Sequence, residues 1–465
     1  MVFSSLLFIF QFLPAALILY FIAPKRLRNT VLFLVSLVFY SWGEARYLPL
    51  MIALILVNYL CAIFVEKTKE KPGVRLAFLL FSVVASIGML IVFKYYDFFA
   101  RNIGAVFSVE IKALNLTLPL GISFYTFQSL AYTIDVYRGK AKAQRNIINL
   151  GAYVVMFPQL IAGPIVRYTE VSAELESRHS IRAEDLEDGM EDLIIGLAKK
   201  VLIANNVGML WTEVEKIGFR TISTPLAWIG ILAFSLQIYF DFSGYSQMAI
   251  GLGKMLGFKF PQNFNNPYIA RSVTDFWRRW HMTLGTWFRD YLYFPLGGSR
   301  RGNKRTILNL FIVWALTGLW HGASWTFLLW GLYFFLLLVI EKSGFISFLN
   351  EKKLFSHIYM IIVLLFGWAL FAITDFALLF EFVSRMVVPA SLLPGGYTVG
   401  AIYYFRNYAV ILSLGCFFST SLAGRLYEKI RGRRLLKILV MSVLFLTSIA
   451  YLVDSTFNPF LYFRF

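Results

Sequence analysis

Long apolar runs alternate with short polar segments along the whole chain. In the first hundred residues the apolar runs cover 6–23, 30–43, 47–65 and 76–100, and a fifth begins at Leu118. A helix needs about 20 apolar residues to cross a bilayer, so each of these runs is a candidate span. Continued to the C-terminus, the pattern predicts an all-α integral membrane protein with about 11 transmembrane helices.

The regular pattern is interrupted after Ile147. The stretch MFPQLIAGPIVRY holds two prolines and a glycine in a short apolar segment. Irregular backbone cannot face lipid, so this composition predicts a broken or re-entrant segment that lines a polar cavity. The charged and amphipathic segment 167–206 follows, and we expect it to lie along the cytoplasmic membrane surface. A further span, from Pro225 to Gly244, carries Asp241 at membrane depth.

Charge follows the same alternation. The net charge is +18, and the basic residues cluster between the apolar runs. The positive-inside rule explains this excess better than nucleic-acid binding does. Lys25, Arg26 and Arg28 come after the first apolar run, the reverse of a cleavable signal, so we expect a retained span with an extracytoplasmic N-terminus. Alternating spans also place the C-terminus outside. The only cysteines, Cys61 and Cys416, lie in apolar runs, and we expect neither a disulfide framework nor a metal site.

His321 interrupts sequence that is otherwise fit for lipid. The apolar run before it, from Thr306 to Trp320, is about 22 Å long as a helix, against about 30 Å of hydrocarbon. The imidazole would therefore lie below the outer surface, and Gly318 and Gly322 would permit close helix approach or a helix break. A titratable ring at this depth predicts a functional site. The alternative is a histidine that only hydrogen-bonds to a neighbouring helix.

A second histidine, His281, lies in the charged stretch DFWRRWHMTLGTWFRDYLYF. Trp277, His281 and Leu284 have helical spacing, with charged residues on the other faces. So many charges exclude a lipid-facing span, and we predict one helix that is buried in protein or lies at the interface. For His281 too, a buried interhelical hydrogen bond is the alternative to a functional role.

Three separated motifs occur in the order NFNNPYIARSVTDFWRRWH, FRDYLYFPLGG and WHGASW. With YSWGEARYLPL, YFDFSGYS and FNPFLYFRF, they resemble the membrane-bound O-acyltransferase family, in its bacterial alginate O-acetyltransferase-like branch. The resemblance implies a single membrane-embedded acyltransferase domain over 1–465, with transmembrane, re-entrant and interfacial helices around a central tunnel. One departure is Gln247, where an acidic residue is usual in the branch, and this puts any role of that carboxylate in doubt.

The resemblance implies that His321 and His281 are catalytic. A desolvated imidazole stays neutral near pH 7 and can take a proton from an attacking hydroxyl, and a thioester donor requires no metal. His281, or Asp275, would orient the donor or stabilise the oxyanion. The supporting residues implied by the motif are Asp275, Trp277, Asn263 and Asn265. No bound cofactor is expected, with acetyl-CoA acting as the donor substrate.

Arg278, Arg279 and Arg289 are candidates to hold the phosphates of coenzyme A through charge-assisted hydrogen bonds. The alternative is that they are ordinary positive-inside residues. The C-terminal tail 454–465 is aromatic and expected to be extracytoplasmic, and its twelve residues reach up to about 40 Å when extended. In similar proteins such a tail is thought to accept the acyl group, which makes Tyr462 a candidate relay. The alternative is an interfacial aromatic anchor.

These expectations combine into a multi-pass enzyme of a bacterial cytoplasmic membrane. It would move acetyl groups from cytoplasmic acetyl-CoA outward, for O-acetylation of an exported or cell-wall polysaccharide, through an extracytoplasmic SGNH or esterase-like partner. Within the family, the alternative is D-alanyl transfer from a carrier protein to teichoic acids. From another class, the alternative is a polymer-precursor transporter or channel, although no internal repeat of the kind that many transporters contain is visible.

Overall fold

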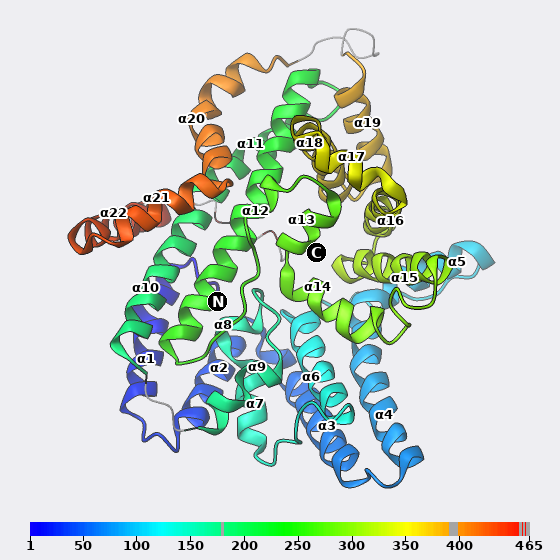
Figure 1. The fold of residues 1–465 in the computed structure, drawn as a ribbon, viewed down its shortest axis with the longest axis vertical. Coiled ribbons are helices and arrows are strands. Elements are labelled where there is room, and N and C mark those ends of the chain that lie inside the picture. Colours follow the sequence, from blue (N-terminus) through cyan, green and yellow to red (C-terminus); the bar gives the residue numbers. More distant parts are fainter. Residues whose placement is uncertain (178–180, 390–398, 455–457, 459–460, 462–465) are drawn as a thin grey trace. The chain divides into compact units, whose positions relative to one another are not determined.

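The structure, a computed structural model, describes residues 1–177, 181–389, 399–454, 458 and 461. Over these residues the chain is helical, and its only β pairing is an isolated bridge between Ile222 and Val399 (Figure 1). The chain forms two compact units, residues 1–193 with 245–261, and residues 194–244 with 262–465. Two helices, α10 (Ala183–Ala198) and α12 (Thr224–Met255), contribute to both units.

The first unit contains the N-terminal helices. Here α3 packs against α4 and α6, and α2 packs against α7 (Figure 1). The predicted runs at the N-terminus match the helices observed there. The helices of this unit are α1 (Leu13–Ile22), α2 (Arg28–Glu44), α3 (Leu48–Lys67), α4 (Pro72–Leu90), α5 (Tyr96–Phe107), α6 (Ile122–Tyr137), α7 (Ile147–Val155), α8 (Phe157–Leu160) and α9 (Tyr168–Glu176).

One buried amide joins three of these helices. The Asn58 side chain on α3 accepts hydrogen bonds from Ser82 of α4, at 2.7 Å, and from Thr133 of α6, at 2.9 Å. Its Nδ2 donates to Ser86, also on α4, at 3.2 Å. Apolar side chains gain little from leaving lipid for another apolar surface, so such polar contacts help to define how membrane helices associate.

The predicted broken segment is confirmed. Helix α7 ends at Val155, Met156 leaves the helical region, and after the single turn of α8 the chain continues irregularly through buried residues to Val166. Two hydrogen bonds connect this segment to α7: Gln159 Nε2 donates to the Tyr153 carbonyl, and the Tyr153 hydroxyl donates to the Val166 carbonyl. The irregular backbone is thus buried in protein, as the absence of water in lipid requires.

The prediction of a surface-lying segment at 167–206 was wrong for most of its length. From Ala183 the chain forms one continuous helix to Ile217, through α10, η4 (Lys199–Ala204) and α11 (Asn205–Ile217). This helix is long and apolar enough to cross a membrane, and most of its apolar window is buried. One charge of this segment, Lys200, is buried because it has an anionic partner in the interior.

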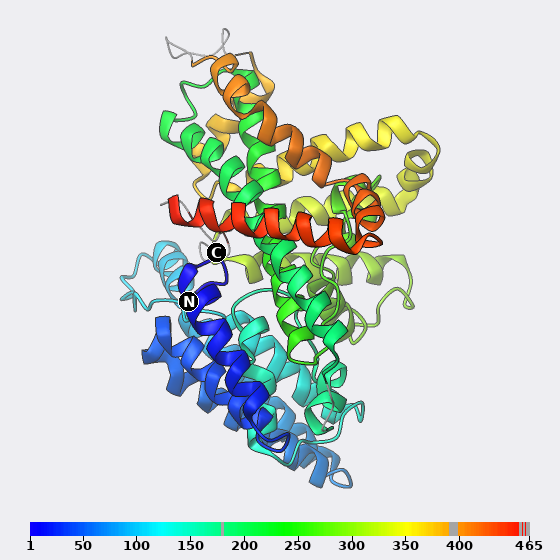
Figure 2. The same cartoon turned by 90° about the vertical axis from the view of Figure 1, so that its left-hand side faces the viewer.

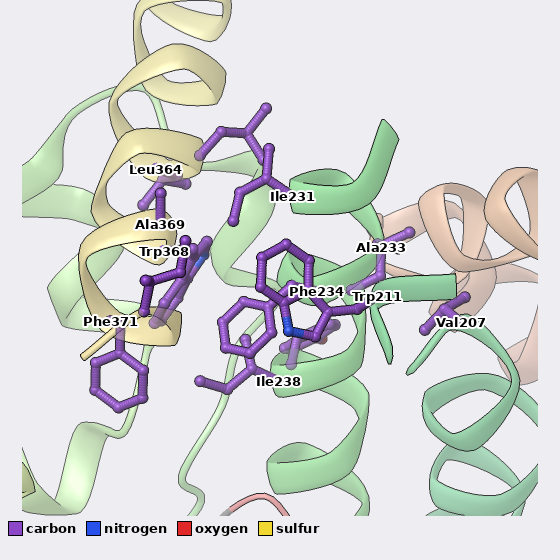
Figure 3. Packing of buried hydrophobic residues seen from close by; sticks show 14 of the residues in the cluster. Val207, Trp211, Ile231, Ala233, Phe234, Ile238, Leu364, Trp368, Ala369 and Phe371 are labelled. Carbon is purple, nitrogen blue, oxygen red and sulfur yellow. The ribbon is translucent and has the colours of Figure 1, made fainter. Parts of the chain in front are cut away.

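The second unit has an extensive aromatic core. Trp211 of α11 and Phe234 of α12 approach with ring centroids 5.3 Å apart, and Trp368 and Phe371 of α18 (Lys353–Ala372) belong to the same buried cluster (Figure 3). Buried aromatic rings contribute most of the apolar area of such a core. The remaining helices of this unit are α13 (Val273–Arg279), α14 (Met282–Phe288), α15 (Asn303–His321), α16 (Trp325–Ile340), α17 (Ile346–Glu351), α19 (Phe376–Val387), α20 (Ile402–Phe418), α21 (Ser421–Arg431) and α22 (Arg434–Asp454).

Seven helices of the described chain are long and apolar enough to span a membrane, or eight if α20 and α21 count as one span across their 77° bend (Figure 2). The multi-pass character is confirmed, whereas the count of about 11 spans is not. Two predicted runs form helices shorter than this length criterion, namely the first run, which forms the helix Phe8–Ile22, and the fifth, which forms α6.

Helices α15 and α16 pack closely at the end that carries His321. A methyl group on Gly318 would overlap the carbonyl oxygen of Phe327, and one on Gly331 would overlap that of Trp314. The predicted close approach at Gly318 is therefore confirmed. The predicted short helix was wrong in length, because α15 begins at Asn303 and is about 28 Å long.

Replacing Gly318 by Ala should destabilise the second unit by about 1–3 kcal/mol, because two helix backbones must move apart to admit the methyl group. Gly88 of α4 is the matched control, since a Cβ there meets nothing within 4 Å. Thermal unfolding in detergent should show a lowered midpoint for Gly318→Ala and an unchanged or raised midpoint for Gly88→Ala. Equal midpoints for the two variants would show that this contact is not tight.

Candidate functional site

His281 lies at a break between two short helices. It follows α13 and precedes α14, with φ 43° and ψ 53°, the left-handed conformation that non-glycine residues rarely adopt. The predicted single helix carrying Trp277, His281 and Leu284 was therefore wrong. Strained backbone of this kind persists only where the surroundings hold it, and it is frequent at functional sites.

Asn263 holds the imidazole. Its Oδ1 lies 3.1 Å from His281 Nδ1, and it accepts from the Thr283 backbone N–H at 3.3 Å and from the Thr283 hydroxyl at 2.9 Å. Because a backbone N–H can only donate, the Asn263 atom at this position is the carbonyl oxygen. His281 Nδ1 must therefore carry a proton and donate it to Asn263. The backbone carbonyl of Asn263 also accepts a hydrogen bond from the Met282 backbone N–H, at 2.9 Å. This bond further fixes the break between α13 and α14.

The other ring nitrogen of His281 is left with a lone pair. His281 Nε2 is buried and has no hydrogen-bond partner among the residues that the structure describes. The ring lies edge-on to Phe242, with centroids 4.7 Å apart, and its centroid is 6.0 Å from that of Trp320. Burial lowers the pKa of His281 to about 3, because desolvation disfavours the imidazolium. The residue is a neutral imidazole whose free nitrogen can only accept a hydrogen bond or a proton.

A carboxylate that the sequence analysis did not identify supports the helix before His281. Glu341 is fully buried and accepts hydrogen bonds from the backbone N–H groups of Val273 and Thr274, at 2.6 and 2.9 Å, and from the Thr274 hydroxyl at 2.7 Å. These groups open α13, where free N–H groups and the helix dipole favour a negative charge. An acidic residue directly after the apolar run of α16 was the available signal.

His321 is the last residue of α15 and is half-buried. Its ring centroid lies 5.0 Å from Trp330 and 5.1 Å from Phe371, both edge-on, and 4.9 Å from its neighbour Trp320. Trp320 thus contacts both histidine rings. The structure brings the two predicted catalytic histidines into one aromatic environment, and part of the His321 side chain stays accessible.

The other predicted site residues have identifiable contacts. Trp277 packs against the Trp314 ring, with centroids 4.9 Å apart, in the aromatic group that also includes Trp330. Asp275 forms an ion pair with Arg279 at 2.9 Å, one helical turn away. Asn265 has an exposed side chain, and its backbone N–H donates to the Arg279 carbonyl. Neither Asp275 nor Asn265 contacts a histidine ring in any hydrogen bond of the described residues.

The remaining candidates are Arg278, Arg289, Gln247 and Tyr462. Arg278 is exposed, and the exposed Arg289 pairs with Asp290 at 2.9 Å. Gln247 belongs to the first unit, where its side-chain amide donates to Asp192 at 3.0 Å. The position where the branch usually has an acidic residue is thus next to the carboxylate of Asp192 on α10. Tyr462 lies outside the described residues. The catalytic and binding roles of all these residues stay predictions.

Acid should destabilise the protein through His281. The pKa of His281 is about 3 in the folded chain and 6.5 without burial. Between pH 3 and pH 6.5, His281 therefore binds a proton in the unfolded chain that it does not bind in the folded chain. The stabilisation is complete above pH 6.5 and falls by about 1.4 kcal/mol per pH unit below it, or about 2 kcal/mol at pH 5. His281→Asn tolerates the left-handed backbone and keeps a donor for Asn263, so its unfolding midpoint should drop less between pH 7.5 and pH 5. The same pH slope in both proteins would contradict a buried neutral His281.

Comparison with known proteins identifies the family of this chain. The model of the membrane-bound O-acyltransferase family matches residues 140–383, more than half of the chain. A probable alginate O-acetylase from Azotobacter vinelandii is 36% identical over 100% of both chains. A peptidoglycan O-acetyltransferase from Helicobacter pylori is 36% identical, over 74% of this chain and 71% of that protein. A teichoic acid D-alanyltransferase from Bacillus subtilis is 29% identical, over 54% and 65%. The family match and the relative that aligns along the entire chain establish that this protein belongs to the membrane-bound O-acyltransferase family.

Proposed function

We propose that this enzyme takes acetyl groups from cytoplasmic acetyl-CoA and passes them across a bacterial cytoplasmic membrane for O-acetylation of an exported or cell-wall polysaccharide. The observation that carries the proposal is the neutral His281 imidazole, with its free Nε2, in one aromatic environment with His321. Relatives named for alginate and peptidoglycan O-acetylation support acetyl as the acyl group and a polysaccharide as the acceptor.

His321 is the proposed general base. An acceptor hydroxyl attacks the thioester carbonyl, a C–O bond forms, and the hydroxyl proton moves to the imidazole of His321. The C–S bond then breaks, and the imidazolium returns the proton to the departing thiolate of coenzyme A. The C-terminal end of α15 favours positive charge near its last residue, which suits a histidine that becomes an imidazolium during transfer.

His281 is proposed to orient the donor. An oxyanion would need a hydrogen-bond donor, and the one N–H of neutral His281 is already given to Asn263. Its Nε2 can instead accept a hydrogen bond from an amide N–H of the donor's pantetheine arm. Of the two roles that the sequence left open for this residue, the tautomer that the Asn263 contact requires favours orientation of the donor.

The phosphates of coenzyme A would bind Arg278, with Arg279 and Arg289 as further contacts. Arg278 and Arg289 are both exposed, and Arg289 pairs with Asp290 while Arg279 pairs with Asp275. Both of these pairs are partly exposed, and exposed pairs are weak enough to exchange for a phosphate. The acyl group would leave through Tyr462 and an extracytoplasmic SGNH or esterase-like partner. We place both termini outside.

His321→Ala should lower kcat for release of free coenzyme A from acetyl-CoA by about 10²–10⁴-fold, the usual contribution of a general base. His281→Asn should instead raise KM by about tenfold, since it removes one hydrogen-bond acceptor for the donor. Purified protein in nanodiscs and a thiol-reactive dye provide the measurement. Unchanged kcat in well-folded His321→Ala would exclude His321 as the base. If the protein turned over a D-alanyl carrier thioester but not acetyl-CoA, acetyl-CoA would be excluded as the donor.

Tyr462→Phe should abolish labelling of the polysaccharide by radioactive acetyl-CoA in cells that contain the partner. The substitution keeps the aromatic ring but removes the hydroxyl that would form the ester. The matched control adds Phe463→Tyr to the Tyr462→Phe variant. It tests whether a tyrosine hydroxyl one position later can replace that of Tyr462. Wild-type labelling in Tyr462→Phe would show that the tail acts only as an anchor.

A further inference from the structure

The second unit contains a buried ion pair that the proposed chemistry does not use. Lys200 Nζ of η4 lies 2.7 Å from Asp241 Oδ1 of α12, and the side chains are each 3% exposed. Lys200 also donates to Asn205 Oδ1, at 2.9 Å. Burying two charges has a desolvation cost that their attraction often fails to recover, so this pair is weak evidence for added stability.

The remaining hydrogen-bonding groups of this cluster bind two described residues of the C-terminal segment, Asn458 and Leu461. Asp241 Oδ2 accepts from the backbone N–H of Leu461 at 2.8 Å. Asn205 Nδ2 donates to the Asn458 side-chain oxygen at 3.2 Å. Leu461 is 4% exposed and packs in the same apolar cluster as Trp280 and Phe240. Both residues that the structure describes after Asp454 are thus hydrogen-bonded to this cluster, Leu461 through Asp241 and Asn458 through Asn205.

We propose that Lys200, Asp241 and Asn205 form a binding site for the C-terminal segment and position it for catalysis. A backbone N–H that enters an apolar interior needs an acceptor, and a carboxylate is a strong one. Lys200 neutralises that carboxylate, and its bond to Asn205 Oδ1 fixes the amide so that Nδ2 is directed to Asn458. One ion pair thereby arranges two anchoring points three residues apart.

This binding site is connected to the histidines through α12. Asp241 is followed on this helix by Phe242, whose ring lies edge-on to His281. Leu461 is followed in the sequence by Tyr462. The three anchoring side chains are therefore positioning residues for the acceptor tyrosine, and this consequence, unlike the binding itself, rests on the proposed function.

The experiment measures how accessible residue 461 is in the full-length protein. Leu461→Cys is made in a Cys416→Ser background, because Cys416 is exposed whereas Cys61 is buried. The protein in nanodiscs is treated with a membrane-impermeant maleimide. Adding Lys200→Met with Asp241→Leu removes the acceptor without leaving an unpaired charge. Labelling should become at least about tenfold faster, because one hydrogen bond to a charged acceptor is lost. An unchanged labelling rate would overturn the proposal.

Two further variants keep the experiment decisive. Asp192→Asn breaks another ion pair, Asp192 with Lys254 at 2.6 Å, that does not touch the tail, and it should leave the labelling rate unchanged. If it accelerates labelling equally, the effect is general loosening and the proposal fails. If the double variant does not fold, as judged by gel filtration, Asn205→Leu removes the Asn458 anchor and one hydrogen bond of Lys200 but keeps the Lys200–Asp241 pair, and it should raise the rate by about threefold. No increase in that variant would also overturn the proposal.

A functional measurement separates this inference from the proposed function. The double variant should retain slow release of coenzyme A from acetyl-CoA but lose acetyl transfer to polysaccharide. The labelling result does not depend on acyl transfer, so a released tail with normal polysaccharide acetylation would refute the positioning role and leave the binding site intact. If labelling is fast in the double variant, and the protein without these two substitutions shows no acetyl-CoA turnover, the proposed function is refuted and the binding site is not.

Discussion

The hydrogen bond from His281 Nδ1 to Asn263 Oδ1 is the contact on which the site depends. The same oxygen accepts from the Thr283 backbone, so it fixes at once the amide orientation, the imidazole tautomer and the break between α13 and α14. A histidine held in this way offers one free nitrogen and no free proton. The left-handed backbone at His281 has an energetic cost, and the Asn263 contacts offset it at the position where the ring must face Phe242 and Trp320.

Buried polar groups determine how this apolar chain is assembled. Asn58 joins α3, α4 and α6, Glu341 holds the start of α13, and Asp241 holds both Lys200 and the backbone of Leu461. In each case one side chain satisfies several donors or acceptors, which limits the cost of its desolvation. Apolar packing is abundant everywhere in such a chain and therefore specifies little. The few polar contacts specify which helices meet and how the histidines are presented.

Much of the fold could be predicted because it is written in local composition. The apolar runs predict α2, α3 and α4, and the prolines and glycine of MFPQLIAGPIVRY predict the break after α7. Local composition fails where the deciding partner is distant in sequence. Lys200 looks like a surface charge until Asp241 is placed beside it, and Glu341 looks like the end of a span until its contacts to Val273 and Thr274 are known. Of the site, the motifs identified Asn263 and His281 as a set, but the helical spacing around His281 was misleading.

The protonation of His281 can be observed directly. Nitrogen NMR of protein labelled with ¹⁵N-histidine, assigned by comparison with His281→Asn, distinguishes a ring nitrogen that carries hydrogen from one that does not. We predict that from pH 5 to pH 8 His281 gives one protonated nitrogen, Nδ1, and one bare nitrogen, Nε2. An imidazolium at pH 7, or the tautomer with hydrogen on Nε2, would contradict the account.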